Sequence, residues 1–375
     1  MARAGRPDED IGLALFGITD WGSFFTDLLA FFALYLAICI SLNLEMGYAG
    51  IPNFGKVLYF AGGAAFSGSV AIRVAALLLN VGGNAVGINN FIIASQMTGL
   101  LKDNVPVSVV LILVTLLVGA VVGAALGYLS SFPAIRLRED YLAMLLLGSA
   151  TFFQLFLNNY TPIINGTFGI GVPDMFAWAG QYATLAVTLL IAAFALLVYL
   201  YSERLVRSPL GRTLRAIRDN EAASEALGKD TVAIRREVLI VASIITGIAG
   251  ALYTIYTGDT NPGIYDRVTW TFWPWLIVIM GGVANNVGVA VGSFVFVFLL
   301  KFIDAAKFTL QNVLPFDVNW LEYLVFGSAL IVILMLRSQG ILPEKSSATL
   351  GRQRVSAIVD KAKGAGAAEE PEDGP

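Results

Sequence analysis

The sequence contains no histidine and only one cysteine, Cys39, among its 375 residues. Without histidine, the chain lacks the commonest metal ligand and the commonest general base near neutral pH. The single cysteine lies in an apolar run, so no intrachain disulfide framework is possible. Charged residues make up 14% of the chain, against about 25% in soluble domains. These shortages argue against a metalloenzyme and against a disulfide-stabilised secreted domain.

Sequence signatures of several enzyme classes are also missing. There is no phosphate-binding G-x-x-x-x-G-K-[S/T] loop, no H-E-x-x-H zinc motif and no G-x-S-x-G nucleophile elbow. The net charge is only −3, and no basic run is typical of a nucleic-acid surface. We therefore predict a non-catalytic protein with no catalytic residue, no metal site, no cofactor and no nucleic-acid partner.

Apolar residues are what the chain has in excess, at 57% with a mean hydropathy of +0.74. Such a chain belongs in a bilayer, where each spanning helix needs about 20 apolar residues. We predict an all-α polytopic membrane protein with about 8 to 10 transmembrane helices. Its parts are a polar N-terminal tail at 1–23, a transmembrane domain at 24–337 and a cytoplasmic, largely disordered tail at 338–375. No cleavable signal peptide is expected.

The apolar runs place the expected spans along the chain. One apolar run, 88–101, cannot be assigned from the sequence and is compatible with a span, a re-entrant segment or a helix lying flat. The number of spans before residue 105 and the side of the N-terminus therefore stay open. Spans are expected at 24–46, 57–79, 106–129, 141–157, 182–201, 238–256, 269–283, 287–302 and 320–336.

Charged and tryptophan side chains of these runs are expected near the membrane surface. Long side chains at the ends of spans can reach the interface, and ionisable groups at mid-depth are costly. Their scarcity argues against a proton-coupled carrier. A tryptophan cluster is expected to form an interfacial belt, with a substrate surface as the alternative. The charged residues are Asp27, Glu45, Lys56, Lys301 and Asp304, and the tryptophans are Trp270, Trp273 and Trp275.

A basic stretch interrupts the apolar sequence at 202–237. Within it, Asp219 or Asn220 can cap a helix of about two turns, because a short side-chain oxygen accepts the free N–H groups of the first turn. Glu221 then lies where a helix N-terminus favours negative charge, and Gly228 suits the left-handed position after the helix. The spacing alone favours an ordinary cytoplasmic loop held inside by its arginines. Its first arginines are Arg204, Arg207, Arg212, Arg215 and Arg218.

The distribution of arginines predicts an orientation, because basic loops stay on the cytoplasmic side. If loop 203–237 is cytoplasmic, counting spans places 159–181, 258–268 and 304–319 outside. The same count places Arg136 and Arg138, residues 285–286 and the C-terminal tail inside. Two glycosylation-type triplets, at Asn159 and Asn165, fall in an outside loop, but such triplets are common by chance.

Three stretches resemble the permease subunits of branched-chain amino acid ABC importers, specifically the M-type subunit. The first is Gly-Tyr-Ala-Gly at 47–50 followed by Gly55, and the second is Pro-Ala-Ile-Arg-Leu-Arg-Glu-Asp-Tyr-Leu-Ala at 133–143. The third runs from Gly-Arg-Thr-Leu-Arg at 211–215 to Gly228. With Gly281, Gly282 and Gly288, the resemblance covers about residues 25–337.

The resemblance implies that helix 219–228 docks into a separate ATPase subunit. The residues carried over are Glu221, Ala223, Glu225, Leu227 and Gly228. The implied partners are a second permease subunit in a heterodimer, two ATP-binding subunits, an extracytoplasmic solute-binding protein and membrane lipid. The chain departs from the family at the docking motif, with four residues instead of three between Ala223 and Gly228, so contacts carried over from other importers do not transfer directly.

The glycine-rich segment at 47–56 is too polar for a lipid-facing helix, and broken backbone at membrane depth needs protein or a cavity around it. Under the resemblance it would offer backbone and amide groups to the solute. The alternative is that its glycines only permit close helix packing. The family usually has serine and histidine where this chain has Asn53 and Lys56. The predicted path residues are Gly47, Tyr48, Gly50, Asn53 and Gly55.

The resulting prediction is an importer permease for branched-chain or other neutral amino acids in the cell membrane. A permease for urea or short amides is the nearest alternative. A self-contained channel or secondary carrier is the rival from another class and would show inverted repeats, which are not evident. A membrane enzyme is disfavoured because histidine and any catalytic cluster are absent.

Overall fold

The computed structural model describes residues 21–87, 89–137, 139–311, 317–337, 339–344 and 356. The chain divides into two units, Met1–Pro343 and Glu344–Pro375, and the fold described here is that of the first. Its two strands, β1 (Ile170–Gly171) and β2 (Asp259–Thr260), have two residues each and pair antiparallel. Everything else with regular structure in the described part is helical, so the predicted all-α class is confirmed.

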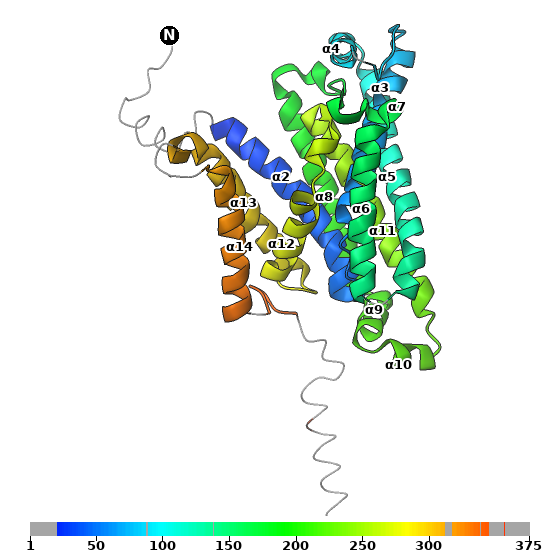
Figure 1. The fold of residues 1–375 in the computed structure, drawn as a ribbon, viewed down its shortest axis with the longest axis vertical. Coiled ribbons are helices and arrows are strands. Elements are labelled where there is room, and N and C mark those ends of the chain that lie inside the picture. The colour runs from blue at the N-terminus through cyan, green and yellow to red at the C-terminus, as the bar shows by residue number, and fades with distance from the viewer. Residues whose placement is uncertain are drawn as a thin grey trace, which may run out of the picture. The chain divides into compact units, whose positions relative to one another are not determined.

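The helices follow the order predicted from the apolar runs (Figure 1). They are α2 (Trp21–Leu42), η1 (Asn43–Tyr48), α3 (Lys56–Leu78), α4 (Asn90–Leu101), α5 (Val105–Arg136), α6 (Glu139–Asn159), α7 (Thr161–Ile164), η2 (Gly166–Phe168), η3 (Ala177–Tyr182), α8 (Ala183–Arg207), α9 (Pro209–Asp219), α10 (Glu221–Ala226), α11 (Thr231–Thr257), η4 (Pro262–Ile264), η5 (Val268–Phe272), α12 (Trp273–Gly281), α13 (Asn286–Gln311) and α14 (Asn319–Leu336).

Seven helices of the described residues are long and apolar enough to cross a membrane, and two shorter apolar helices accompany them at Val268–Gly281 and Trp320–Ile333. The polytopic membrane architecture is thereby confirmed. Helix α4 has 12 residues, which corresponds to a length of about 18 Å. A bilayer core is about 30 Å thick, so α4 is too short to span it.

The bundle has two ends that differ in what they carry (Figure 1). One end, the α10 end, holds α9, α10 and the junctions of α8 and α11 with them. The other, the α4 end, holds α4, α7 and the paired strands. Helix α2 begins near the α4 end. Asp27 in its first turns accepts a hydrogen bond from the hydroxyl of Tyr256, which lies where α11 ends beside the strands. Asp27 is half-buried near that end, and its place at the membrane interface stays a prediction.

Small residues allow α3, α5 and α11 to pack with their backbones almost in contact. A methyl group on Gly63 of α3 would overlap the carbonyl of Gly247 on α11. A methyl group on Gly123 of α5 would lie 2.5 Å from the carbonyl oxygen of Ser243 on α11. Glycine at these crossings is therefore required by the close approach of the helices.

We expect Gly63→Ala to lower the stability of the chain by about 1–3 kcal/mol, since the added methyl forces two packed helices apart. The unfolding temperature of the detergent-purified chain measures the effect. Gly148→Ala is the matched control, because Gly148 is exposed on α6 and a methyl there meets no atom within 4 Å. Equal unfolding temperatures for the two variants would contradict the packing argument.

The tryptophan cluster does not form the interfacial belt that the sequence predicts. Trp270 is 1% exposed, and its ring stacks on Phe60 with centroids 3.8 Å apart. Trp275 stacks on Phe54 at 4.1 Å. Trp273 is also buried. The interfacial prediction was wrong because η5 and α12 lie inside the bundle, where their rings fill the space beside α2 and α3.

Candidate functional site

The glycine-rich segment breaks the helical path between α2 and α3, as predicted. Helix α2 continues into the π-helix η1, and the chain then runs without regular structure until α3 begins at Lys56. Gly50 adopts a φ of +69°, a conformation that favours glycine because a Cβ would clash with the backbone. Residues 49–55 are all buried or half-buried, so other elements of the chain cover the break.

A buried ion pair closes this break. The Lys56 ammonium lies 2.6 Å from the Glu45 carboxylate, and neither side chain has any exposed surface. Lys56 also donates a hydrogen bond to Ser41 at 3.0 Å. The Asn53 amide donates to the other carboxylate oxygen of Glu45 at 2.9 Å. Partners of this kind are what a buried charge requires.

The prediction that Glu45 and Lys56 reach the membrane surface was therefore wrong. The π-helix and the turn at 49–55 fold the two residues toward each other, so each charge is compensated within the protein. Lys301 and Asp304 differ from this pair, because they are 3.8 Å apart and the Asp304 side chain is 44% exposed. Among the ion pairs of the described residues, only Glu45 and Lys56 are both fully buried.

The predicted path residues all lie in this segment, but the chain itself already uses their polar groups. The Asn53 side-chain oxygen accepts a hydrogen bond from the Gly55 N–H at 2.8 Å, and the Asn53 backbone carbonyl accepts one from the Trp275 indole N–H at 3.1 Å. Gly47, Tyr48, Asn53 and Gly55 are buried, and Gly50 is half-buried. The exposed backbone expected for a solute is not seen in the single chain, and a role in the path stays a prediction.

Buried asparagines tie η1 to the turn before α13. The Asn43 side chain accepts a hydrogen bond from the Ala284 N–H at 2.8 Å and donates one to Asn286 at 3.0 Å. Asn286 in turn donates to the Glu203 carboxylate near the end of α8, at 3.1 Å. The segment around η1 is therefore joined by side-chain hydrogen bonds to elements distant in sequence.

The predicted short helix is present as α10. Of the two candidate caps, Asn220 is the one used, and its side chain accepts a hydrogen bond from the Ala223 N–H at 3.0 Å. Asp219 instead pairs with Arg218. Gly228 follows the helix with a φ of +76°, as predicted for a C-terminal glycine. Glu221 and Glu225 lie within the helix, and Leu227 occupies its C-cap.

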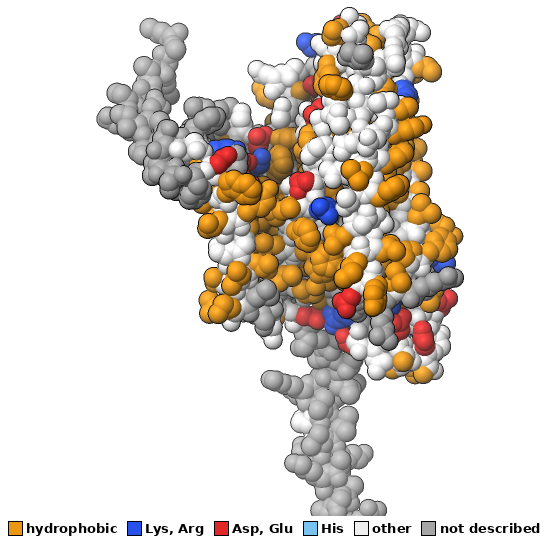
Figure 2. All heavy atoms as spheres, viewed as in Figure 1, with side chains coloured by type: hydrophobic (Ala, Val, Ile, Leu, Met, Phe, Trp, Pro, Cys, Tyr) orange, Lys and Arg blue, Asp and Glu red, His pale blue; other side chains and the backbone are white. Residues whose placement is uncertain are grey.

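Helix α10 is bound to the bundle on one side and open on the other. Glu221 pairs with Arg235 of α11 at 2.9 Å, and Glu225 accepts a hydrogen bond from Thr231 at 2.8 Å. Leu227 is 81% exposed and Ala223 is exposed. Figure 2 shows acidic and basic side chains gathered at this end of the molecule, with apolar atoms among them. The open side of α10 therefore presents an exposed leucine and alanine among charged side chains.

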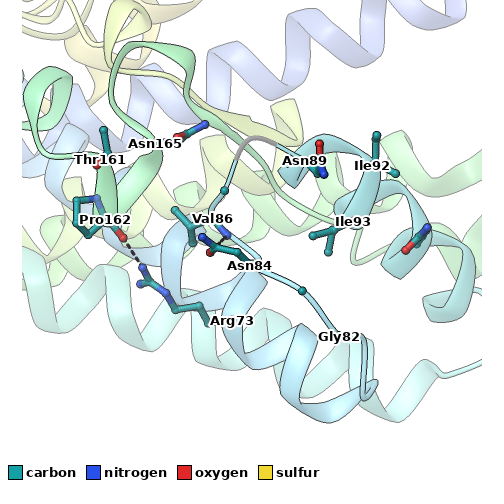
Figure 3. A pocket seen from close by; sticks show the side chains of 13 residues that line it. Arg73, Gly82, Asn84, Val86, Asn89, Ile92, Ile93, Thr161, Pro162 and Asn165 are labelled. Carbon is teal, nitrogen blue, oxygen red and sulfur yellow. Dashed lines mark hydrogen bonds between the residues drawn. The ribbon is translucent and has the colours of Figure 1, made fainter.

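A pocket with a volume of about 870 Å³ opens at the α4 end (Figure 3). It lies between the end of α3, the loop before α4 and the short helix α7. Arg73 is the only charged residue among its described lining, and its guanidinium donates to Ser69 at 2.8 Å and to the Pro162 carbonyl. The rest of the lining is glycine, amide, hydroxyl and apolar side chains, so the pocket offers hydrogen bonds and one positive charge.

Residues 24–334 match the family described as "Branched-chain amino acid transport system / permease component". The chain belongs to this permease family. The match covers the bundle from α2 into α14, which includes the break, the ion pair and α10. The family assignment predicted from the three sequence stretches is confirmed.

Individual relatives agree with the family. The permease is 35% identical over 85% of its length to a "Probable branched-chain amino acid transport permease protein LivM" of Methanocaldococcus jannaschii, covering 93% of that protein. It is 28% and 27% identical to the "High-affinity branched-chain amino acid transport system permease protein LivM" of Escherichia coli and of Salmonella typhimurium, each over 58% of this chain and 54% of the relative. No solved structure matches the permease.

Several residues that organise the permease were not among the predicted sites. Asn43, Asn286 and Glu203 carry the links around η1, and Arg218 joins α9 to it. The available signal was a polar residue inside or beside an apolar run, since buried polar groups need partners. That signal identifies such residues but does not say which of them meet.

Proposed function

We propose that the permease is the membrane-spanning subunit of an ABC importer and forms the translocation path for branched-chain or other neutral amino acids. A separate ATPase subunit would supply the energy by binding the 219–228 helix. The observation that carries the proposal is α10 itself: a capped helix held to the bundle by Glu221 and Glu225, with an exposed apolar residue beside it. A two-turn helix is not stable alone, and here the bundle holds it in place.

We propose that the α10 end is cytoplasmic and that the α4 end is outside. Arginines are concentrated at the α10 end, and basic residues near the ends of spans favour the cytoplasmic side. Loop 203–237 and the C-terminus would then both lie inside the cell, in a multi-pass protein of the cell membrane. The pocket beside Arg73 would open outward, toward an extracytoplasmic solute-binding protein.

The outer faces of α5, α6 and α8 suit lipid and a second permease subunit. Only 22% to 28% of their most apolar windows is buried inside the chain. Large exposed side chains on these helices include Leu117 and Val121 of α5 and Phe152 of α6. A heterodimer would place the solute path between two such chains, and two ATP-binding subunits would complete the complex.

The experiment that tests this function is reconstitution of the complete complex in proteoliposomes. ATP is enclosed with the ATPase subunits, and the binding protein is added on the other side. We expect ATP-dependent uptake of radiolabelled leucine that urea in excess does not inhibit. Uptake of urea or short amides in place of leucine would favour the alternative substrate. Uptake by the purified permease without the ATPase would overturn the proposal in favour of a channel or carrier.

A further inference from the structure

We propose that Arg218 is the positioning residue that transmits movement of α10 to the broken segment between α2 and α3. The inference rests on the proposed function, because it assigns a path to the coupling that this function requires. Arg218 lies at the end of α9, directly before the junction with α10. Its side chain reaches out of the cytoplasmic loop into the bundle.

The contacts of Arg218 join the two segments directly. Its guanidinium donates a hydrogen bond to the Gly47 carbonyl of η1 at 2.6 Å and another to Asp219 at 3.0 Å. A planar guanidinium can donate in two fixed directions at once, whereas an ammonium acts as a point charge. The Arg218 side chain is 24% exposed and the Asp219 side chain 67%, so the bond to the buried Gly47 is the one that is partly shielded from water.

The segment that receives the contact is shaped to fit it. A Cβ on Gly50 would lie 3.1 Å from Cγ of Arg218, and Gly50 has a φ of +69°. Another residue at this position would be strained by the positive φ, and its side chain would press on the arginine. The neighbouring Arg215 lies over the ring of Tyr48, 5.8 Å from its centroid. Arg218 and Arg215 together thus contact Gly47, Tyr48 and Gly50 of this turn.

The connection from α10 to Arg218 is short and rigid. The Asn220 N–H donates to the Ala216 carbonyl at 2.9 Å, which closes the end of α9. The buried Ser224 of α10 donates its hydroxyl to the Asn220 carbonyl at 3.0 Å. Leu214 and Ile217 anchor α9 in the bundle with 0% and 1% exposure. These hydrogen bonds join α9 directly to α10, and a force on α10 would pass through them to the arginine.

Beyond Gly47, the displacement reaches the ion pair. Glu45 lies in the same π-helix, and its partner Lys56 is the first residue of α3. Packed interiors transmit small shifts because they lack the space to absorb them. A movement at Arg218 would thus act on the base of α3 through the buried pair. The other side-chain bonds from α10, Glu221 to Arg235 and Glu225 to Thr231, join α11 instead.

The test compares Arg218→Ala with Arg212→Ala in the reconstituted complex. Arg212 is an exposed arginine on the same helix, so it controls for the loss of one positive charge. The measured quantity is the amount of leucine taken up per ATP hydrolysed. We expect this ratio to fall about tenfold for Arg218→Ala, within the usual range of coupling between sites, and to stay at the wild-type value for Arg212→Ala.

Arg218→Lys adds a readout that a merely structural role would not give. The lysine keeps a donor for the Gly47 carbonyl but loses the second direction toward Asp219, so we expect it to restore part of the ratio. Normal uptake per ATP in Arg218→Ala would overturn the inference alone. Failure of Arg218→Ala to assemble would also overturn it, because the residue would then hold the fold. Absence of ATP-driven uptake in the wild-type complex would overturn the proposed function and the inference together.

Discussion

Replacement of Lys56 by methionine is expected to destabilise the permease by about 3–5 kcal/mol, the usual cost of leaving one member of a buried ion pair without its partner. Glu45 would keep only the hydrogen bond from Asn53, and its carboxylate has no contact with solvent. Folded proteins are stable by only about 5–15 kcal/mol. The unfolding temperature in detergent and the amount of protein in the membrane should therefore both fall sharply.

The double variant Glu45→Gln with Lys56→Met is expected to recover most of this loss. Replacing both members of a buried pair by uncharged groups is often neutral or stabilising, and glutamine can still accept the hydrogen bond from Asn53. Arg207→Met is the control, because the Arg207 side chain is 75% exposed in its pair with Glu203 and exposed pairs contribute about 0–1 kcal/mol. A Lys56→Met variant as stable as the control would show that the pair carries little of the fold.

Local features of the fold could be predicted well from the sequence. The cap at Asn220 and the left-handed Gly228 depend on a few neighbouring residues, and both are present. The apolar runs predicted the order of the long helices for the same reason, since each run alone decides whether it favours a membrane. The break at 47–55 was also predictable, because glycine, proline and amide residues are incompatible with a lipid-facing helix.

The ion pair could not be predicted in the same way. Glu45 and Lys56 lie near the ends of apolar runs, where a charged side chain normally reaches water. Only the path of the backbone through the π-helix brings them together. A π-helix is a local insertion whose position the hydrophobic pattern does not reveal. The hydrophobic pattern therefore predicted that both charges reach the membrane surface, whereas in the structure both are buried.

The contacts of the candidate site could not be predicted either, because they also depend on the path of the backbone. Arg218 was visible as one of several arginines, and nothing in the spacing distinguishes it from Arg212. Its contact with Gly47 depends on how α9 folds back under η1. Trp270 and Trp275 show the converse case, in which a residue type common at membrane interfaces fills the interior. Contacts between distant segments have to be observed, and residue type alone does not supply them.

The double variant Glu221→Arg with Leu227→Asp is expected to abolish association with the ATPase subunit and all ATP-driven uptake. It reverses a charge at the start of α10 and places a carboxylate on the most exposed apolar residue of that surface. Loss of the Leu227 anchor costs about 2 kcal/mol or more, and Glu221→Arg also breaks the pair with Arg235 that holds α10 to the bundle, so we expect binding to weaken by well over a factor of about ten. Co-purification of the tagged permease with the ATPase measures the effect.

The control for this variant applies the same changes at the other end of the bundle. Asp103 and Phe168 are both exposed there, with Phe168 at 79%, so Asp103→Arg with Phe168→Asp should leave ATPase binding unchanged. The α10 variant should still co-purify with the second permease subunit, because Asn220 continues to cap the helix and the spans are untouched. ATPase bound equally by both variants would mean that the energy of transport enters the permease elsewhere, and Arg218 would then have nothing to transmit.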